Sequence, residues 1–205
     1  MRGFDARFLE QYRARRAAGE PAPPPRAPRA AVRAALPFAA APGPARILGV
    51  DTSLRSTGLA MIEADGPRMR FLDCRPIRNA VRLSMAECLV NIASMLERYL
   101  DEFKPDEVAM EGIFFCKNAR TSLVLGHARG VVVATCARRG LPMAEYPPAR
   151  VKQAVTGTGR ATKGQMQRMM QRVFALPDLP QEDAADALAI AMTHAHARRL
   201  AVAAR

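Results

Sequence analysis

The distribution of proline divides this chain into a segment that cannot fold by itself and a segment that can. Residues 1–45 hold eight of the sixteen prolines, and most of the remainder is alanine and arginine. Such a segment buries too little apolar area to offset the entropy that ordering costs. We therefore expect a disordered arm over residues 1–45, a folded domain over residues 46–200 and a short tail over residues 201–205.

Apolar runs that begin after Arg46 predict an α/β domain. The expected strands cover residues 47–51, 59–63, 69–77, 108–114 and 142–146, and the expected helices cover residues 83–103, 121–139, 162–175 and 182–199. The strands are short runs bounded by turn residues, whereas the helices show apolar residues at helical spacing. Three successive strands followed by alternating helices and strands predict a mixed sheet flanked by helices.

Four carboxylates occupy positions for which secondary structure gives little reason. Asp51 ends an apolar run, Glu111 interrupts another, and Asp183 and Asp186 lie three residues apart in an Ala-rich helical pattern. Carboxylates in apolar surroundings are costly to desolvate, and converging ones repel one another unless a cation compensates. The spacing of Asp183 and Asp186 places both on one helix face. Taken singly, Asp51 could be a turn residue and Asp183 a helix N-terminal acid.

The donor atoms of these four side chains predict the type of metal. Oxygen ligands suit Mg²⁺ or Mn²⁺, whereas zinc prefers cysteine and histidine. We expect two Mg²⁺ ions, with Mn²⁺ as a substitute. Two such ions can position a water molecule, stabilise the charge on a phosphate and hold the leaving oxygen during phosphodiester cleavage. The pattern therefore predicts a metal-dependent enzyme that cuts nucleic acid.

The net charge of +12 is concentrated in one middle segment. Residues 112–177 carry eleven lysines and arginines against Glu145 alone, whereas residues 46–111 and 178–205 are mildly acidic. A basic stretch between acidic ones suits a polyanion that lies across one face of the protein. A basic but merely solvated surface is the alternative, because residues 1–45 are rich in arginine as well.

Cysteine, histidine and hydropathy patterns limit the remaining possibilities. The cysteines have no metal-binding or redox spacing, so we expect small core residues in a reducing compartment. No apolar run approaches the roughly 20 residues of a membrane-spanning helix, and we expect no secretory signal, because the first residues lack a continuous apolar region. We therefore expect a cytoplasmic protein without a membrane partner. His194 and His196 do not face the same way on their helix, and both are expected in its solvated last turns.

Five motifs resemble the RuvC family of Holliday-junction endonucleases. In chain order they are Ile47-Leu48-Gly49-Val50-Asp51, Glu111-Gly112-Ile113-Phe114, Gly126-His127-Ala128-Arg129-Gly130, Val151-Lys152-Gln153 and Asp183-Ala184-Ala185-Asp186-Ala187-Leu188-Ala189. Their order and approximate spacing match the family across residues 46–199. The resemblance implies an RNase H-like fold, a homodimer and symmetric, metal-dependent cleavage of four-way DNA junctions in recombination and repair. It also implies a branch-migration motor as a further partner.

The resemblance implies roles for individual residues. Four residues match the family's metal-binding, catalytic carboxylates: Asp51, Glu111, Asp183 and Asp186. Phe114 matches an aromatic residue that stacks on a base near the junction, and Lys152 and Lys163 match basic residues near the scissile phosphate. Arg150, in the same basic segment, is expected to bind DNA with them. From the residues alone, Phe114 could equally be a core aromatic and the two lysines ordinary surface residues.

Three features depart from the family's pattern. Thr52-Ser53 follows the first Asp where the family has Pro-Gly, Gly112 stands where it has Gln, and the arm over residues 1–45 has no counterpart in compact members. The first two bear on how DNA approaches the metals. Two alternatives therefore stay open: a structure-specific DNA-binding protein with weakened cleavage, and another RNase H-like nuclease such as one that cuts RNA–DNA hybrids.

The helix over residues 121–139 is the expected dimer surface. Leu123-Val124-Leu125 and Val131-Val132-Val133 contain more apolar residues than one buried stripe uses. A twofold dimer would supply the two active sites that two symmetric cuts require.

Overall fold

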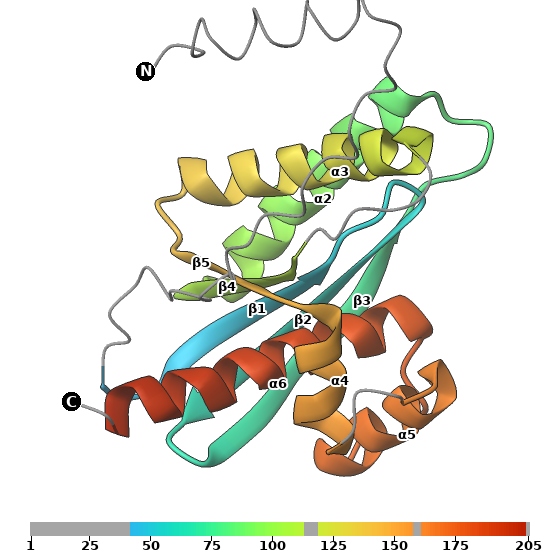
Figure 1. Cartoon of the computed structure of the whole chain (residues 1–205). Coiled ribbons are helices and arrows are strands. Elements are labelled where there is room, and N and C mark those ends of the chain that lie inside the picture. The colour runs from blue at the N-terminus through green and yellow to red at the C-terminus, as the bar shows by residue number, and fades with distance from the viewer. Residues whose placement is uncertain (1–41, 113–118, 158–160, 204–205) are drawn as a thin grey trace, which may run out of the picture. The chain divides into compact units, whose positions relative to one another are not determined.

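The computed structural model describes residues 42–112, 119–157 and 161–203, in which a five-stranded sheet is covered by helices on both faces (Figure 1). The strands are β1 (Ala45–Asp51), β2 (Ser56–Asp65), β3 (Arg68–Arg78), β4 (Glu107–Glu111) and β5 (Met143–Tyr146). The helices are α2 (Met85–Phe103), α3 (Ala119–Arg138), α4 (Pro148–Thr156), α5 (Lys163–Val173) and α6 (Glu182–Ala203). Phe114 and nearly all of the expected arm lie outside the described residues.

The sheet changes from antiparallel to parallel at its central strand. Its order is β3-β2-β1-β4-β5, with β2 antiparallel to both β1 and β3, and β4 parallel to both β1 and β5. Parallel neighbours end at the same edge of a sheet. Asp51 is the last residue of β1 and Glu111 the last residue of β4, so the topology brings these two acids to one edge.

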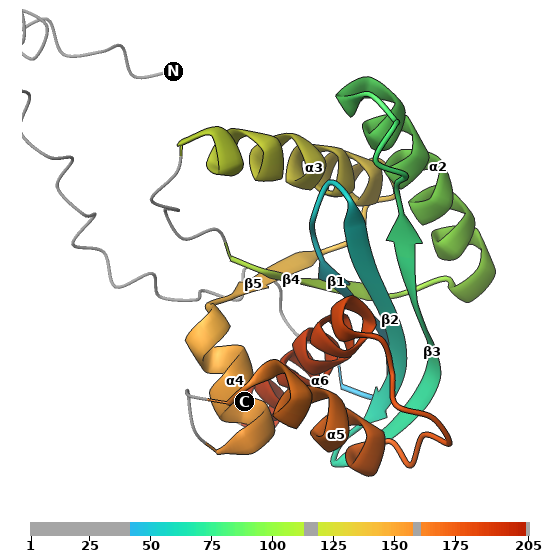
Figure 2. The ribbon, with the colours of Figure 1, turned by 90° about the vertical axis from the view of Figure 1, so that its right-hand side faces the viewer.

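Alternation along β1 and β4 decides which face these two acids occupy. The core beneath α2 and α3 includes Leu48, Val50, Val108 and Met110. Ile47 and Ala109 belong instead to the core beneath α6. Because successive side chains point to opposite faces, Asp51 and Glu111 fall on the α6 face. Figures 1 and 2 both show α2 and α3 on one side of the sheet and α4, α5 and α6 on the other.

Two glycines let α6 lie unusually close to the sheet. A Cβ atom at Gly49 would lie 2.0 Å from the carbonyl oxygen of Ala187, and one at Gly58 would lie 1.9 Å from that of Asp183. No side chain fits at these distances, so only glycine permits the approach. The helix contributes small buried alanines to the same interface. This close packing places the first turns of α6 over the ends of β1 and β2.

Local signals explain where the helices begin and end. Ser84 caps α2 through a capping box with Glu87, and Lys104, with φ +48°, ends the helix just before Pro105. Thr162 caps α5 in the same way through Gln165.

Three differences from the sequence prediction bear on the site. Helix α4 is absent from the prediction, because Pro147-Pro148 indicates the end of a strand, although a proline also fits the first helical turn well. β4 ends at Glu111, which therefore lies at the end of a strand and not in its interior. Helix α6 continues past residue 199 to Ala203.

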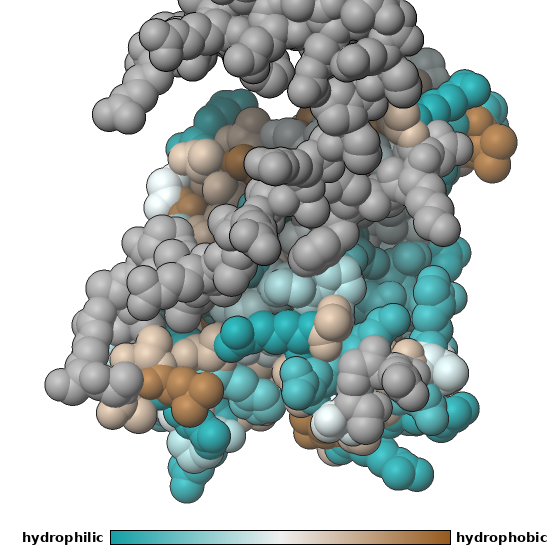
Figure 3. Space-filling model, in the orientation of Figure 1, coloured by the Kyte–Doolittle hydropathy of each residue, from teal (hydrophilic) through white to brown (hydrophobic). Residues whose placement is uncertain are grey.

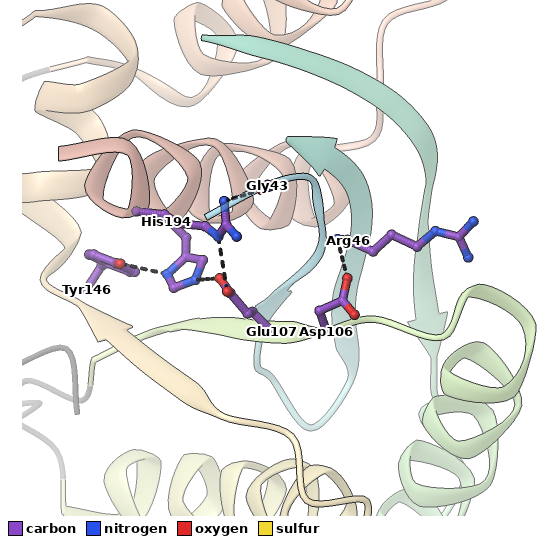
Figure 4. A network of polar contacts seen from close by, with 7 residues as sticks. Gly43, Arg46, Asp106, Glu107, Tyr146 and His194 are labelled. Atoms are coloured by element: carbon purple, nitrogen blue, oxygen red, sulfur yellow. Dashed lines mark hydrogen bonds and ion pairs between the residues drawn. The ribbon is translucent and has the colours of Figure 1, made fainter. Parts of the chain in front are cut away.

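His194 is fully buried, so the expectation of a solvated position was wrong. Its Nε2 atom lies 2.8 Å from Oε2 of Glu107, and its Nδ1 atom lies 2.7 Å from the hydroxyl oxygen of Tyr146 (Figure 4). Arg198 donates from Nε to Oε1 of Glu107 and from Nη1 to the carbonyl oxygen of Gly43. We call Gly43, Glu107, Tyr146, His194 and Arg198 the Glu107 network. A buried carboxylate needs such partners, and β4 presents Glu107 directly to α6.

Candidate active site

A cleft of about 380 Å³ opens where β1 and β4 end against α4, α5 and α6. Asp51, Glu111 and Asp186 line it together with Lys152 and Lys163. The acids come from β1, β4 and α6, whereas the lysines come from α4 and α5. Three of the four predicted carboxylates and both predicted lysines therefore share one cavity.

The acids of the cleft raise one another's pKa. Burial and the charges of Asp186, Glu111 and Asp183 raise the pKa of Asp51 to about 7, against a smaller opposing effect of Lys163. Burial and Asp186 also raise the pKa of Glu111, although Lys152 and Arg129 oppose the shift. Such mutual repulsion in a half-buried space indicates a site whose negative charge exceeds what the neighbouring cations neutralise.

Asp183 lies beside the cleft, where a serine contacts its carboxylate. It belongs to the first turn of α6, and its Oδ2 atom accepts a hydrogen bond from the hydroxyl of Ser56 on β2. Its charge raises the pKa of both Asp51 and Asp186. Asp183 is thus electrostatically part of the cluster, although its carboxylate is turned towards β2.

The carboxylates of the described residues do not form a complete coordination shell for a metal ion. Across residues 42–112, 119–157 and 161–203, no three His, Cys, Asp or Glu side chains are placed closely enough to hold an ion between them. The donor set nevertheless fits a hard divalent cation, because it consists of carboxylate oxygens whose ionised forms destabilise one another.

The basic residues differ in how they relate to the cleft. Lys163 forms an ion pair with Glu182 at the start of α6. Burial raises the pKa of Asp186, and Lys163 and Lys152 oppose that rise. Arg150 is exposed on α4, and its guanidinium lies 5.9 Å from the centre of the Tyr146 ring. Arg150 therefore stands at the β5 side of the cleft and is not one of its lining residues.

Several residues of the site were missed by the sequence analysis. Ser56 gives no signal in a Ser/Thr-rich turn, since many such hydroxyls only bond to local backbone. Gly49 and Gly58 did carry a signal, because an isolated glycine within a strand indicates a close backbone approach. Arg129 lies in the Gly126–Gly130 motif, but the sequence alone gives it no role. In the structure its Nη1 atom donates to the carbonyl oxygen of Glu111 at 2.6 Å.

The family model for crossover junction endodeoxyribonuclease RuvC matches residues 47–194. The chain belongs to this family. A RuvC from Rhodopseudomonas palustris (strain BisA53) is 45% identical over 155 residues, which cover 76% of this chain and 89% of that protein. A RuvC from Halorhodospira halophila (strain DSM 244 / SL1) is 45% identical over 153 residues, covering 75% of this chain and 91% of the relative.

Solved structures agree with the assignment to the RuvC family. RuvC of T. thermophilus in complex with Holliday junction substrate matches with a TM-score of 0.71 and 30% identity, covering 76% of this chain and 96% of that one. The yeast mitochondrial Holliday junction resolvase Ydc2 matches with a TM-score of 0.59 and 11% identity, covering 82% and 84%, and shares the fold. The expected RNase H-like fold is confirmed.

The two departures from the RuvC motifs have different surroundings in the structure. Thr52 follows Asp51, and its hydroxyl oxygen is buried without a hydrogen-bond partner among the described residues. Ser53 takes part in a local turn, in which its amide donates to the hydroxyl oxygen of Thr57 at 3.3 Å. The amide of Gly112 donates to the carbonyl oxygen of Tyr146 at 2.8 Å, which continues the β4–β5 pairing past Glu111.

Proposed function

We propose that this protein resolves Holliday junctions by symmetric, metal-dependent cleavage of DNA during recombination and repair. The observation that carries the proposal is the meeting of Asp51, Glu111 and Asp186 in one cleft that also contains Lys152 and Lys163. Membership of the RuvC family supports the same activity. The RuvC of T. thermophilus has been solved with a Holliday junction substrate, which is the substrate we infer for this chain.

The four carboxylates are proposed as the metal ligands, and their roles differ. Asp51, Glu111 and Asp186 line the cleft and can each offer an oxygen to Mg²⁺ or Mn²⁺, two ions being the expected number. Asp183 can join them if its carboxylate leaves Ser56. Metal bound there would neutralise the scissile phosphate and lower the pKa of the attacking water. Lys152 and Lys163 would hold the neighbouring phosphates as point charges.

The path of DNA is proposed to continue from the cleft across α4 and α5. A second cavity of about 300 Å³ lies there, lined in part by Gln165, Arg168 and Arg172. Arg168 and Arg172 are four residues apart on α5, so they face the same way. Both are exposed, and Figure 3 shows mainly hydrophilic residues over the region of these helices. Arg150, Lys152 and Lys163 complete the proposed contact surface, which Phe114 would extend to the bases.

We further propose a homodimer with α3 in the interface. Leu123 on α3 is 66% exposed, so a second copy could cover this apolar side chain. Two copies would present two clefts to the two strands that a symmetric resolution cuts.

A branch-migration motor is the proposed further partner, and the cytoplasm is the proposed location. None of the described helices is both long and apolar enough to cross a membrane.

Three labelled substrates test the proposed activity. The protein is incubated with Mg²⁺ and a mobile four-way junction, a linear duplex or an RNA–DNA hybrid. Paired symmetric nicks in the junction alone are expected. Binding to the junction without any product in Mg²⁺ or Mn²⁺ would favour a DNA-binding protein with weakened cleavage, and cutting of the hybrid would favour another RNase H-like nuclease.

The substitution Glu111→Gln tests the chemistry of the cleft. It removes one negative charge from the site while keeping the shape of the side chain, so cleavage should be lost and junction binding should persist. Glu97→Gln, an acid on the exposed side of α2, is the matched control and should cleave normally. Near-normal cleavage by Glu111→Gln would remove Glu111 from the site.

A further inference from the structure

Arg129 is a buried cation on the face of the sheet opposite the α6 face. It lies on α3, and only 10% of its side chain is exposed. Its neighbours on the helix, Ala128 and Val132, belong to the apolar core beneath α2 and α3. Burying a guanidinium is unfavourable unless acceptors compensate for the lost water. The groups that Arg129 contacts therefore indicate the role of this residue.

Both acceptors lie at the ends of neighbouring strands. The Nη1 atom donates to the carbonyl oxygen of Glu111, the last residue of β4, at 2.6 Å. The Nη2 atom forms an ion pair with Oε1 of Glu145 on β5, also at 2.6 Å, without the alignment of a hydrogen bond. One guanidinium thus joins β4 to β5 at the edge where the cleft opens.

This contact stands where the sheet pairs Glu111 on one side only, since Glu111 is paired with Tyr146 on β5 but has no partner on β1. The pairing of β1 with β4 stops at Val50 and Met110, so Glu111 lies beyond the last paired residue on that side. On the β5 side, the amide of Gly112 donates to the carbonyl oxygen of Tyr146. Within the described part of the chain, no side chain donates to the Glu111 carboxylate. Its direction therefore depends on how its backbone is held.

We propose that Arg129 is a positioning residue for the cleavage reaction. By holding the carbonyl oxygen of Glu111, it fixes the direction in which the Glu111 carboxylate enters the cleft, without contacting DNA or metal itself. This inference rests on the proposed function of Glu111 as a metal ligand. It requires arginine, because two nitrogens of one guanidinium contact Glu111 and Glu145 separately, whereas the ammonium of a lysine is a single point charge.

The other end of β4 provides a matched control. Glu107, its first residue, is held by Arg198, whose side chain is 7% exposed and also contacts two acceptors. Arg129→Lys and Arg198→Lys therefore remove a buried guanidinium of the same kind from opposite ends of one strand. Only the first change lies at the cleft. Both should lower the melting temperature, whereas only the first should alter the response to metal.

The experiment measures three quantities for both variants and the unaltered protein, all well below their melting temperatures. They are Mn²⁺ affinity without DNA by calorimetry, the Mg²⁺ midpoint of single-turnover junction cleavage, and junction affinity in Ca²⁺. Arg129→Lys should weaken Mn²⁺ binding and raise the Mg²⁺ midpoint by about 10- to 100-fold, as is typical when a residue that orients a metal ligand is replaced. Its junction affinity should stay near normal, and Arg198→Lys should change neither metal quantity.

Unchanged Mn²⁺ affinity in Arg129→Lys, or equal losses in both variants, would overturn the positioning role. Glu145→Gln supplies a second test if Arg129→Lys does not fold, because Glu145 is 60% exposed and its loss leaves the bond to Glu111 in place. It should shift the midpoint in the same direction but less, and no shift would count against the proposal. If the unaltered protein binds Mn²⁺ but leaves junctions intact, only the proposed cleavage activity is overturned. If the unaltered protein does not bind Mn²⁺, both the cleavage activity and the positioning role of Arg129 are overturned.

Discussion

The Nε2 atom of His194 lies 2.8 Å from Oε2 of Glu107, and both side chains are buried between α6 and β4. Nδ1 of His194 lies 2.7 Å from the hydroxyl oxygen of Tyr146, so both ring nitrogens have a polar partner. Arg198 also contacts Glu107, from Nε to Oε1. This arrangement makes Glu107 a structural acid, in contrast to Glu111 on the same strand.

Glu107→Gln should destabilise the protein by roughly 3–5 kcal/mol at pH 7, because it removes the carboxylate that balances the buried charge of Arg198. Burial raises the pKa of Glu107, but the hydrogen bonds from His194 and Arg198 outweigh this and hold it below its ordinary value of 4.5. The carboxylate therefore contributes stability above that value, and the contribution is lost as the pH falls through the lowered pKa. Urea unfolding of both proteins at pH 7 and pH 3.5 measures this, and the difference should shrink at the lower pH. Glu102→Gln, an exposed change, should have little effect at either pH.

Asp51→Asn should stabilise the metal-free protein at alkaline pH while abolishing cleavage. The pKa of Asp51 is raised to about 7 by burial and by its acidic neighbours. Between about pH 4 and pH 7 the folded state holds a proton that the unfolded state has released, so stability falls as the pH rises through this window. Melting temperatures in a chelating buffer should therefore differ more between the two proteins at pH 8 than at pH 5. A difference that does not depend on pH would contradict the raised pKa, and Asp65→Asn serves as the exposed control.

Gly58→Ala should displace the start of α6, since the new Cβ atom would lie 1.9 Å from the carbonyl oxygen of Asp183. Overpacking of this kind typically costs about 1–3 kcal/mol, and here it also moves Asp183 and Asp186 away from Asp51. We expect a lower melting temperature together with a loss of cleavage. In Gly130→Ala the added Cβ atom meets no atom within 4 Å, and stability should be kept or improved in that helix. Full activity of Gly58→Ala would show that α6 can shift without disturbing the carboxylates.

Leu123→Asp should convert the proposed dimer into monomers at micromolar concentration, because it places a charge in the apolar surface of α3. Light scattering measures the mass. Leu200→Asp is the matched control, since Leu200 on α6 is 61% exposed, a value close to that of Leu123. A monomeric mass for the unaltered protein, or a dimer that tolerates Leu123→Asp, would remove α3 from the interface.

Replacing both Arg168 and Arg172 by Gln should weaken junction binding and reduce its dependence on salt. Each phosphate contact contributes about 0.9 to the slope of log affinity against log salt concentration, so the double variant should lose roughly 1.8. Fluorescence anisotropy across a series of salt concentrations gives the slope. The pair Arg82→Gln and Arg98→Gln, an exposed arginine just before α2 and one on it, should leave the slope unchanged. An unaltered slope in the first variant would place the DNA away from α5.

Most of the sheet could be predicted from the sequence, because β1, β2 and β3 are apolar runs separated by turn residues. The cluster of Asp51, Glu111 and Asp186 was predicted for a similar reason: an acid within an apolar run has few local explanations. The short helix α4 gave only a weak signal, because Val151 and Val155 are its only buried residues, too few to establish a helical period.

Contacts between residues that are far apart in the sequence account for the other features that could not be predicted. The burial of His194 depends on Glu107, a residue that adjoins it only after β4 and α6 have packed together. The contact of Arg129 with Glu111 involves a backbone carbonyl oxygen, and a backbone atom leaves no trace in the sequence. The roles of the four carboxylates, and of Phe114 outside the described residues, stay predictions.

The five residues of β4 place its two acids on the same side of the sheet, since an even separation along a strand preserves the face. Adding or deleting a single residue between Glu107 and Glu111 would turn one of them towards α2 and α3, into an apolar core. Either the Glu107 network or the cleft would then lose its carboxylate. Variation in the length of β4 itself should therefore not be tolerated.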